Sequence, residues 1–309
     1  MHFKLMDRLL DYGGWTYDPV SIGAVIEATA DKLTTWGAPT PGIGEGKTVC
    51  LYRAFSNTLG RQPTYPNQTS GTCVGRGGAR TVDLLQAMQG AWTAFASSEA
   101  AFAFARIEVG LLEHKQRPPS DGAVVAWVVE AMRKFGSVLR CDPGVPATDD
   151  DDLAQKWGND RKEGVPAALE ALAKRRIVKA WTPISGYTQA RDAIASGYVV
   201  IFGTSRAQWG RSLPAQRDKQ GFLTTRGSTG HCWIATGVVD DRQRPGILLD
   251  NKSWGDDWVA GPKGVLEDMP DGDYLCEADE FDKIVSKGEA YAVSDMEGFE
   301  PKPLDYLFY

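Results

Sequence analysis

The chain has 309 residues, a length that predicts one large domain or about two smaller ones. Apolar residues make up 42% of the sequence and charged residues 24%, which is typical of a globular protein and excludes a wholly disordered chain. Lysine and arginine (34) are outnumbered by aspartate and glutamate (40), so the net charge of −6 provides no basic surface for nucleic acid or anionic lipid. We therefore expect no nucleic-acid partner.

No segment has the character of a membrane anchor or a secretory signal. The longest apolar run, residues 122–129, is far shorter than the roughly 20 residues that cross a bilayer. Residues 1–10 mix charged and apolar side chains and lack the apolar core of a signal peptide. We expect no membrane partner, and a location that is cytoplasmic or within an assembly such as a virion.

Helical patterns dominate the first half of the chain. Apolar periodicity predicts helices over residues 19–34, 73–96, 98–112 and 120–135. Ser120 or Asp121 is placed to cap the last of these helices, and Gly136 to end it. The polar tract 141–165 contains four consecutive aspartates and is interpreted as a solvated loop, because the ligand spacing of a calcium site is absent.

Strand patterns dominate the second half. Short helices at 165–174 and 187–196 are followed by strands predicted over 197–205, 231–241, 246–254 and 290–295. The turns between these strands favour an antiparallel sheet or barrel, so the fold class is α+β.

The change from helical to strand patterns predicts three parts of the chain. We expect an N-terminal extension at 1–60 that packs on the core, a helical lobe at 61–165 and a β-rich lobe at 166–309. The acidic, aromatic segment 299–309 is a candidate docking site for a protein partner in an assembly.

The cysteines and histidines exclude several kinds of site. Five scattered cysteines do not favour a disulfide framework, and three widely separated histidines do not favour a metal site, so no cofactor or metal is expected. Four of the cysteines (Cys50, Cys141, Cys232 and Cys276) are interpreted as structural thiols. Cys232 should point away from His231, into the β-barrel.

Cys73 differs from the other cysteines because it stands at the predicted start of a helix. The positive end of the helix dipole and the free backbone N–H groups there lower the pKa of a thiol. His231 lies in an apolar strand and is the candidate imidazole partner. Asn251 follows an apolar strand and would hold the imidazole through Nδ1–H, with Asp250 as the alternative orienting group.

Four segments carry a resemblance to a known family. Residues 67–75 (NQTSGTCVG) resemble the glutamine loop and nucleophile of papain-like cysteine peptidases, in the Cys-Val-Gly form common among bacterial and phage members. Residues 120–136 are similar to a helix of those members, and Gly230-His231 to the histidine strand of the family. Residues 251–258 (NKSWGDDW) are similar to its Asn-Ser-Trp-Gly-x-x-Trp signature.

The resemblance implies a papain-like fold of two lobes with a peptide-binding cleft between them. The helical lobe would carry Cys73 as the nucleophile, and the β-barrel-like lobe would carry His231 and Asn251. His231 would protonate the leaving amine, Asn251 would orient the imidazole, and Trp254 would shield their hydrogen bond from water.

The resemblance also implies an oxyanion site. The backbone N–H of Cys73 and an upstream side-chain amide would stabilise the oxyanion. The family places its glutamine six residues before the nucleophile, a position held here by Asn67, whereas Gln68 is five residues before it. We favour Gln68, with Asn67 as the alternative. Gly71 and Gly230 would let a substrate backbone approach the site.

The leading hypothesis is a papain-like thiol hydrolase that cleaves peptide or isopeptide bonds through an acyl-enzyme, with a peptide or protein as its substrate. The alternative is a papain-like module with little or no catalysis and a structural role in an assembly such as a virion, since Lys252 interrupts the Asn-Ser-Trp signature. A cell-wall amidase of the CHAP type ranks third.

Overall fold

The computed structural model describes residues 14–29, 40–116, 121–162, 164–206, 214–223, 227–286 and 288–296. Its helices are α2 (Pro19–Thr29), α3 (Arg53–Leu59), α4 (Cys73–Gln89), α5 (Ser98–Ala103), the π-helix η2 (Phe104–Glu113), α6 (Val125–Lys134), α7 (Asp151–Asn159), α8 (Ala167–Ala173), α9 (Tyr187–Ala195), the 3-10 turn η3 (Lys252–Trp254) and α10 (Ala278–Val285). Its strands are β1 (Thr48–Cys50), β2 (Val178–Pro183), β3 (Val199–Arg206), β4 (Ala215–Gln216), β5 (Ser228–Val239), β6 (Gly246–Asp250), β7 (Val259–Ala260), β8 (Tyr274–Glu277) and β9 (Gly288–Met296). The α+β class and the order of a helical part before a β-rich part are confirmed.

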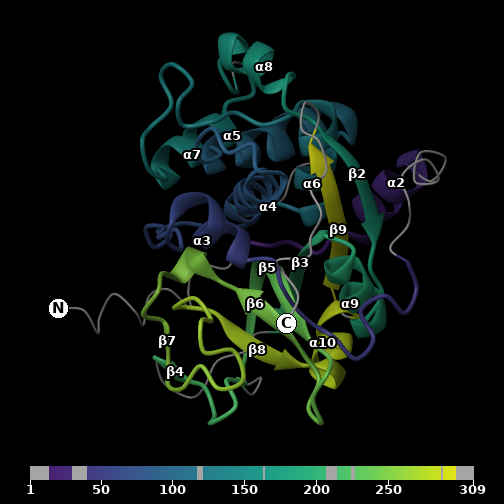
Figure 1. Cartoon of the computed structure of the whole chain (residues 1–309). Coiled ribbons are helices and arrows are strands. Elements are labelled where there is room, and N and C mark those ends of the chain that lie inside the picture. Colours follow the sequence, from purple (N-terminus) through teal and green to yellow (C-terminus); the bar gives the residue numbers. More distant parts are fainter. Residues whose placement is uncertain are drawn as a thin grey trace.

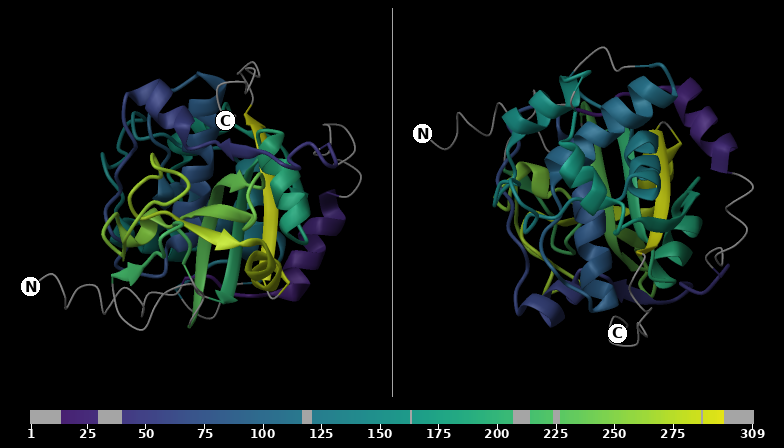
Figure 2. Two further views of the ribbon diagram at one scale, coloured as in Figure 1. Left: turned by 60° about the horizontal axis from the view of Figure 1, so that its bottom comes forward. Right: turned by 90° about the horizontal axis from the view of Figure 1, so that it is seen from above.

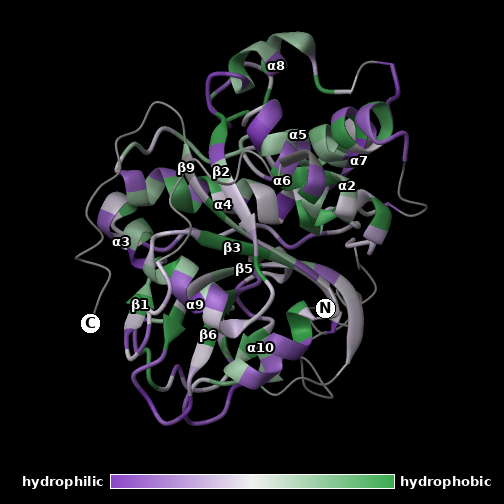
Figure 3. Cartoon of the chain, turned by 90° about the vertical axis from the view of Figure 1, so that its right-hand side faces the viewer, coloured by the Kyte–Doolittle hydropathy of each residue, from purple (hydrophilic) through white to green (hydrophobic). Residues whose placement is uncertain are grey.

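One antiparallel sheet organises the second half of the chain. Its strands lie in the order β2-β9-β3-β5-β6-β8, and β1 pairs with the end of β5. The register pairs Thr204 of β3 with His231 of β5. It also pairs Ile234 with Asp250 of β6, which returns Asn251 toward His231. The first half of strand β3 is strongly apolar, as Figure 3 shows, and this is typical of a strand buried on both faces.

Helix α4 lies between this sheet and the outer helices (Figures 1 and 2). All of its residues from Cys73 to Met88 are buried. The glycines near its start, which weaken a helix in isolation, provide room for neighbours: a Cβ at Gly77 would lie 2.6 Å from the sulfur of Cys232, and one at Gly78 would lie 2.6 Å from Val128. Packing therefore stabilises this helix where its own helical propensity does not.

The aspartate run is not a solvated loop, and the interpretation of that tract was wrong. Asp150 accepts a hydrogen bond from Leu153 N and caps α7, while the side chains of its neighbours Asp149 and Asp151 are buried. Asp151 pairs with Arg76 of α4 at 3.0 Å, and Asp149 lies 3.5 Å from the same guanidinium and also pairs with Arg140. Burial alone would raise the pKa of Asp149, but the two guanidinium groups lower it below its usual range.

The cap of helix α6 also differs from the prediction. The helix begins at Val125, and Asp121 accepts the backbone N–H of Gly71 at 2.9 Å. The carboxylate of Glu289, on β9, instead accepts the N–H groups of Val125 at 2.7 Å and Ala126 at 2.9 Å. A distant carboxylate thus satisfies the N-terminal N–H groups of the helix and interacts favourably with its dipole.

Several elements lack a predicted counterpart: α3, α7, α10, β1, β2, β4, β7 and β8. Residues 30–34 of the first predicted helix, the cap candidate Ser120 and the segment 299–309 lie outside the described residues. Within the described parts of the chain, none of the helices has the length and apolar character needed to cross a bilayer.

We predict that Asp151→Ala lowers the free energy of unfolding by at least about 3 kcal/mol, because it removes one partner of a buried ion pair and leaves Arg76 in a low-dielectric site. Urea titration at pH 7 measures the change. Asp152→Ala is the matched control, since Asp152 is exposed in the same turn, and should cost less than about 1 kcal/mol. Equal losses in the two variants would contradict the importance of the buried pair.

Candidate active site

Cys73 is the first residue of α4, and its thiol is fully buried. The backbone N–H groups of Cys232, Gly14 and Val74 interact with the sulfur, and the Asp121 carboxylate lies within electrostatic range. Burial dominates these contacts and raises the pKa of the Cys73 thiol to about 12, although the N–H groups oppose the increase. The lowered thiol pKa that the helix start predicted is therefore wrong for this state of the molecule.

His231 lies on β5 and is held by Asn251. The ring nitrogen Nε2 lies 2.7 Å from Oδ1 of Asn251, and both residues are buried. The predicted contact through Nδ1 is therefore wrong: Nε2 meets the amide, and Nδ1 has no hydrogen-bond partner among the described residues. Asp250, the alternative orienting group, pairs with Arg80 of α4 at 3.2 Å. The turn η3 (Lys252–Trp254) accommodates the inserted residue without turning Asn251 away.

An aromatic cluster covers this hydrogen bond. The ring of Trp254 lies 4.6 Å from the imidazole of His231, and the ring of Trp233 lies 4.9 Å from it. Trp258 and Tyr274 pack behind Trp254 and Trp233. This arrangement places the imidazole in apolar surroundings that exclude water, which strengthens its interaction with the amide.

Cys232 points to the face of β5 opposite His231 and Trp233, as the strand period requires. That face packs against helix α4, where the sulfur fills the space beside Gly77, and not into a barrel as expected. Burial raises the pKa of this thiol well above its usual value, in agreement with a structural role.

The two candidate oxyanion amides occupy different surroundings. Gln68 is buried, and its backbone N–H donates to the carbonyl of Ser253 at 2.7 Å, which links the glutamine loop to η3. Asn67 is only half-buried, and its Oδ1 lies where a Cβ on Gly255 would be placed. The structure thus favours Gln68 as the inward-facing amide.

The loop before Cys73 is anchored by a carboxylate that sequence reasoning missed. Asp151 accepts hydrogen bonds from the backbone N–H of Thr69 and from the hydroxyl of Thr72, each at 2.5 Å. Gly71, between them, donates to Asp121. The run of four aspartates was visible in the sequence. Its neighbouring residues, however, did not distinguish an aspartate that is buried and holds the loop from one that is exposed to solvent.

Residues 14–16 lie across the site, and no sequence feature had assigned them to it. The backbone N–H of Trp15 donates to the carbonyl of Gly230 at 3.2 Å. On the other side, Ala123 N donates to the carbonyl of Gly14 at 2.7 Å, and Thr16 N donates to the carbonyl of Ala123 at 3.0 Å. The segment therefore pairs with both lobes. We call residues 14–16 the covering segment.

The covering segment contributes to the burial of the site, because Gly14 contacts the Cys73 sulfur and Trp15 pairs with Gly230 beside His231. Cys73 and His231 both have 0% of their surface exposed. Burial lowers the pKa of His231 to about 3, with the nearby Arg80 and Arg76 contributing to the decrease, while the Asn251 bond opposes it. The thiol and the imidazole are thus both neutral at pH 7 while the segment is in place.

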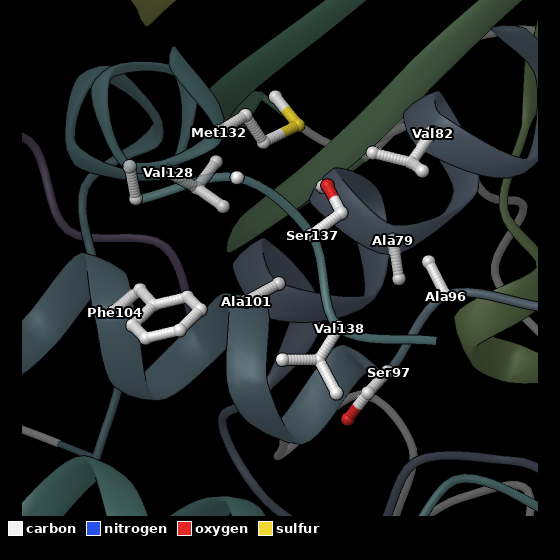
Figure 4. Close-up of a pocket in the computed structure, with 13 residues that line it drawn as sticks. Ala79, Val82, Ala96, Ser97, Ala101, Phe104, Val128, Met132, Ser137 and Val138 are labelled. Carbon is white, nitrogen blue, oxygen red and sulfur yellow. The ribbon is translucent and has the colours of Figure 1, made fainter. Parts of the chain in front are cut away.

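Figure 4 shows a different cavity, between α4, α5, η2 and α6. Its lining is mainly apolar and includes Ala79, Val128 and Met132, and neither Cys73 nor His231 contributes to it. In the described part of the chain, no three His, Cys, Asp or Glu side chains converge as metal ligands would.

Neither a family model nor a curated protein matches this chain. Among solved structures, it is similar to xylellain, a cysteine protease from Xylella fastidiosa, with 14% identity and a TM-score of 0.56 over 92% of this chain and 95% of that one. It is also similar to procathepsin B S9 from Trypanosoma congolense, with 10% identity and a TM-score of 0.51 over 94% and 88% of the two chains. The ragweed cysteine protease Amb a 11 in its proform gives 11% identity and a TM-score of 0.50 over 92% and 77%. The expected papain-like fold is confirmed.

We predict that burial of the neutral His231 imidazole makes the free energy of unfolding decrease as the pH falls. Its pKa decreases from 6.5 to about 3 on folding, so between these values the unfolded chain binds a proton that the folded chain does not. This group should make the free energy of unfolding about 2 kcal/mol lower at pH 5 than at pH 7.5. Urea unfolding of the wild type and His231→Gln at both pH values tests this, because the variant lacks that part of the loss. An identical pH dependence in both proteins would contradict the buried neutral imidazole.

Thiol labelling gives a second prediction. In the wild-type chain at pH 7, iodoacetamide should modify the exposed Cys141 at least ~100-fold faster than the buried Cys73, because only the thiolate reacts. Peptide mapping by mass spectrometry at successive times measures both rates. Comparable rates would show that the covering segment does not protect the site in solution.

Proposed function

We propose that this chain is a papain-like thiol hydrolase that cleaves peptide or isopeptide bonds, with Cys73 as nucleophile and His231 as general acid and base. The observation that carries the proposal is the hydrogen bond of 2.7 Å between His231 Nε2 and Asn251 Oδ1, which leaves Nδ1 available for a proton from the thiol. The papain-like fold supports it, since the similar solved structures are described as cysteine proteases.

The chemistry follows from the two ring nitrogens. With Nε2–H donated to Asn251, Nδ1 is the acceptor that removes the thiol proton and forms an imidazolium. The Cys73 thiolate attacks the substrate carbonyl, and a C–S bond forms. The tetrahedral intermediate then expels the amine, which takes its proton from Nδ1 as the C–N bond breaks. Water, activated by the same nitrogen, hydrolyses the thioester and regenerates the thiol.

Hydrogen-bond donors at the start of α4 stabilise the oxyanion. The backbone N–H of Cys73 lies at the positive end of the helix, where negative charge is favoured. The buried Gln68 supplies the second donor, and its link to Ser253 fixes the loop that carries it. Asp151 positions the same loop through Thr69 and Thr72.

The covered thiol and imidazole define an inactive form of the proposed enzyme. A substrate carbonyl reaches Cys73 only after the covering segment has moved, and water that then enters favours the ionised pair. The alternative, a structural module without catalysis, receives support from the covered site, whereas the orientation of the His231–Asn251 contact, with Nδ1 left available, supports the hydrolase.

Hydrolysis of denatured casein by the wild type and by Trp15→Ala, followed by mass spectrometry of the fragments, tests the proposal. Trp15→Ala is included because it weakens the covering segment. Cys73→Ala in either background should lower cleavage by at least ~10³-fold, and Asn251→Ala by at least ~10-fold. Cys141→Ala is the matched control and should leave cleavage unchanged, because this thiol is exposed.

Two outcomes would overturn the proposal. Cleavage that persists in Cys73→Ala would exclude this thiol as the nucleophile. No cleavage by Trp15→Ala, together with fast alkylation of its Cys73, would show an accessible thiol without hydrolase activity and favour the structural alternative.

A further inference from the structure

Helix α4 carries a buried arginine on the same face as Cys73. Arg80 follows Cys73 by seven residues, about two helical turns, so the two side chains leave the helix on the same side. Only 4% of Arg80 is exposed. Its Nη1 donates to Oδ1 of Asp250 at 3.2 Å, and the centre of the guanidinium lies 4.3 Å from the ring of Tyr65. The guanidinium is therefore held by a carboxylate and an aromatic ring.

Asp250 connects this arginine to the candidate active site. It is the last residue of β6, and the next residue is Asn251, whose Oδ1 lies 2.7 Å from Nε2 of His231. Successive side chains of an extended chain point in opposite directions. The ion pair that draws Asp250 toward α4 therefore leaves Asn251 directed at the imidazole.

The other charged groups near the site have partners of their own. The titratable and charged side chains around His231, Cys73 and Cys232 are Arg76 and Arg80 of α4, Asp250 of β6, Asp121 before α6 and Glu289 of β9. Arg76 is balanced by two carboxylates of the aspartate run. Asp121 and Glu289 accept backbone N–H groups. Asp250 is thus the carboxylate whose direction depends on Arg80.

We propose that Arg80 is a positioning residue of the candidate active site: by holding Asp250, it keeps Asn251 as the group that meets the imidazole and keeps a carboxylate away from that ring. This inference rests on the proposed hydrolase, because it assigns Arg80 to the imidazole of that reaction. Arg80 does not touch the reacting atoms and acts through Asp250. Its positive charge also contributes to the low pKa of His231.

Replacing the guanidinium should change the charge state of His231. Arg80→Met leaves the Asp250 carboxylate in buried surroundings without its cationic partner, and a protonated imidazole is the group that can replace that partner. The loss of a positive charge and the approach of a negative one both raise the pKa of His231, which is about 3 in the folded wild type. We expect the midpoint of its titration to rise by about 1–3 pH units.

NMR of the ring nitrogens, in protein labelled with 15N-histidine, measures the charge and tautomer of His231 between pH 4.5 and pH 8. The chain has only three histidines, and the signal that disappears in His231→Gln identifies the one in the site. In the wild type, the ring should stay neutral with its proton on Nε2. In Arg80→Met, it should gain a proton at the acidic end of this range. Arg80→Lys, which keeps the positive charge, should resemble the wild type.

Two variants separate this effect from a general loss of stability. Arg80→Met/Asp250→Asn removes the carboxylate together with the guanidinium, so the imidazole should return most of the way to the wild-type state. Arg176→Met breaks a different ion pair, with Asp142 at 2.6 Å, and should leave the His231 signals unchanged. If Arg80→Met does not fold, Arg80→Gln takes its place, because glutamine keeps one donor for Asp250. Its midpoint should rise in the same direction but by less.

Casein hydrolysis in the Trp15→Ala background gives a second readout. Arg80→Met should lower kcat at least ~10-fold, because the imidazole no longer has Asn251 as its partner. KM should stay within about 2-fold, since a buried Arg80 makes no contact with the substrate. Arg80→Lys should restore most of kcat.

The possible results distinguish this role from the proposed reaction. An imidazole that stays neutral in both Arg80→Met and Arg80→Gln would overturn the inference. A rise in the double variant equal to that in Arg80→Met would overturn it as well, because Asp250 would then have no part in the effect. If the midpoint rises as expected but no variant cleaves casein, the positioning of the imidazole by Arg80 stands while the hydrolase proposal fails.

Discussion

Complete burial of helix α4 is the constraint on which the rest of the structure depends. Its charged side chains cannot reach solvent, so each requires a partner from another part of the chain. Arg76 takes Asp151 and Asp149, and Arg80 takes Asp250. These partners lie at the start of α7 and at the end of β6. Pairing the charges of α4 therefore also fixes the glutamine loop and the end of β6, which carry the groups next to Cys73.

The pairing of these charges also determines the geometry of the candidate active site. Because Asp250 is committed to Arg80, the next residue, Asn251, is the one presented to His231. A neutral amide beside the imidazole holds the ring without a formal negative charge. Such a partner suits the proposed reaction, in which the positive charge on the imidazole must appear and disappear, since a carboxylate would favour the charged form throughout.

Local sequence signals pointed to the residues of the candidate site, but not to their surroundings. The helix start at Cys73, the apolar strand at His231 and the strand end at Asn251 are encoded by neighbouring residues, and the structure brings His231 and Asn251 into contact. Asp151 was misread because its partner, Arg76, is 75 residues away and a polar run alone does not reveal burial. The cap of α6 was misplaced because Glu289 is distant in sequence. Which imidazole nitrogen meets the amide depends on a side-chain rotamer that periodicity does not determine.

The covering segment competes with any free ligand at a high effective concentration. Trp15, whose buried indole donates to Glu289, is joined to α2 (Pro19–Thr29) by only three residues, so it never diffuses away. A ligand tethered by a short linker acts at an effective concentration of order millimolar. A free peptide that binds equally well must approach this concentration before it displaces Trp15 half of the time. For the proposed hydrolase, the length of the link between Trp15 and α2 would thus set a threshold concentration of substrate, separately from any contact that the substrate makes.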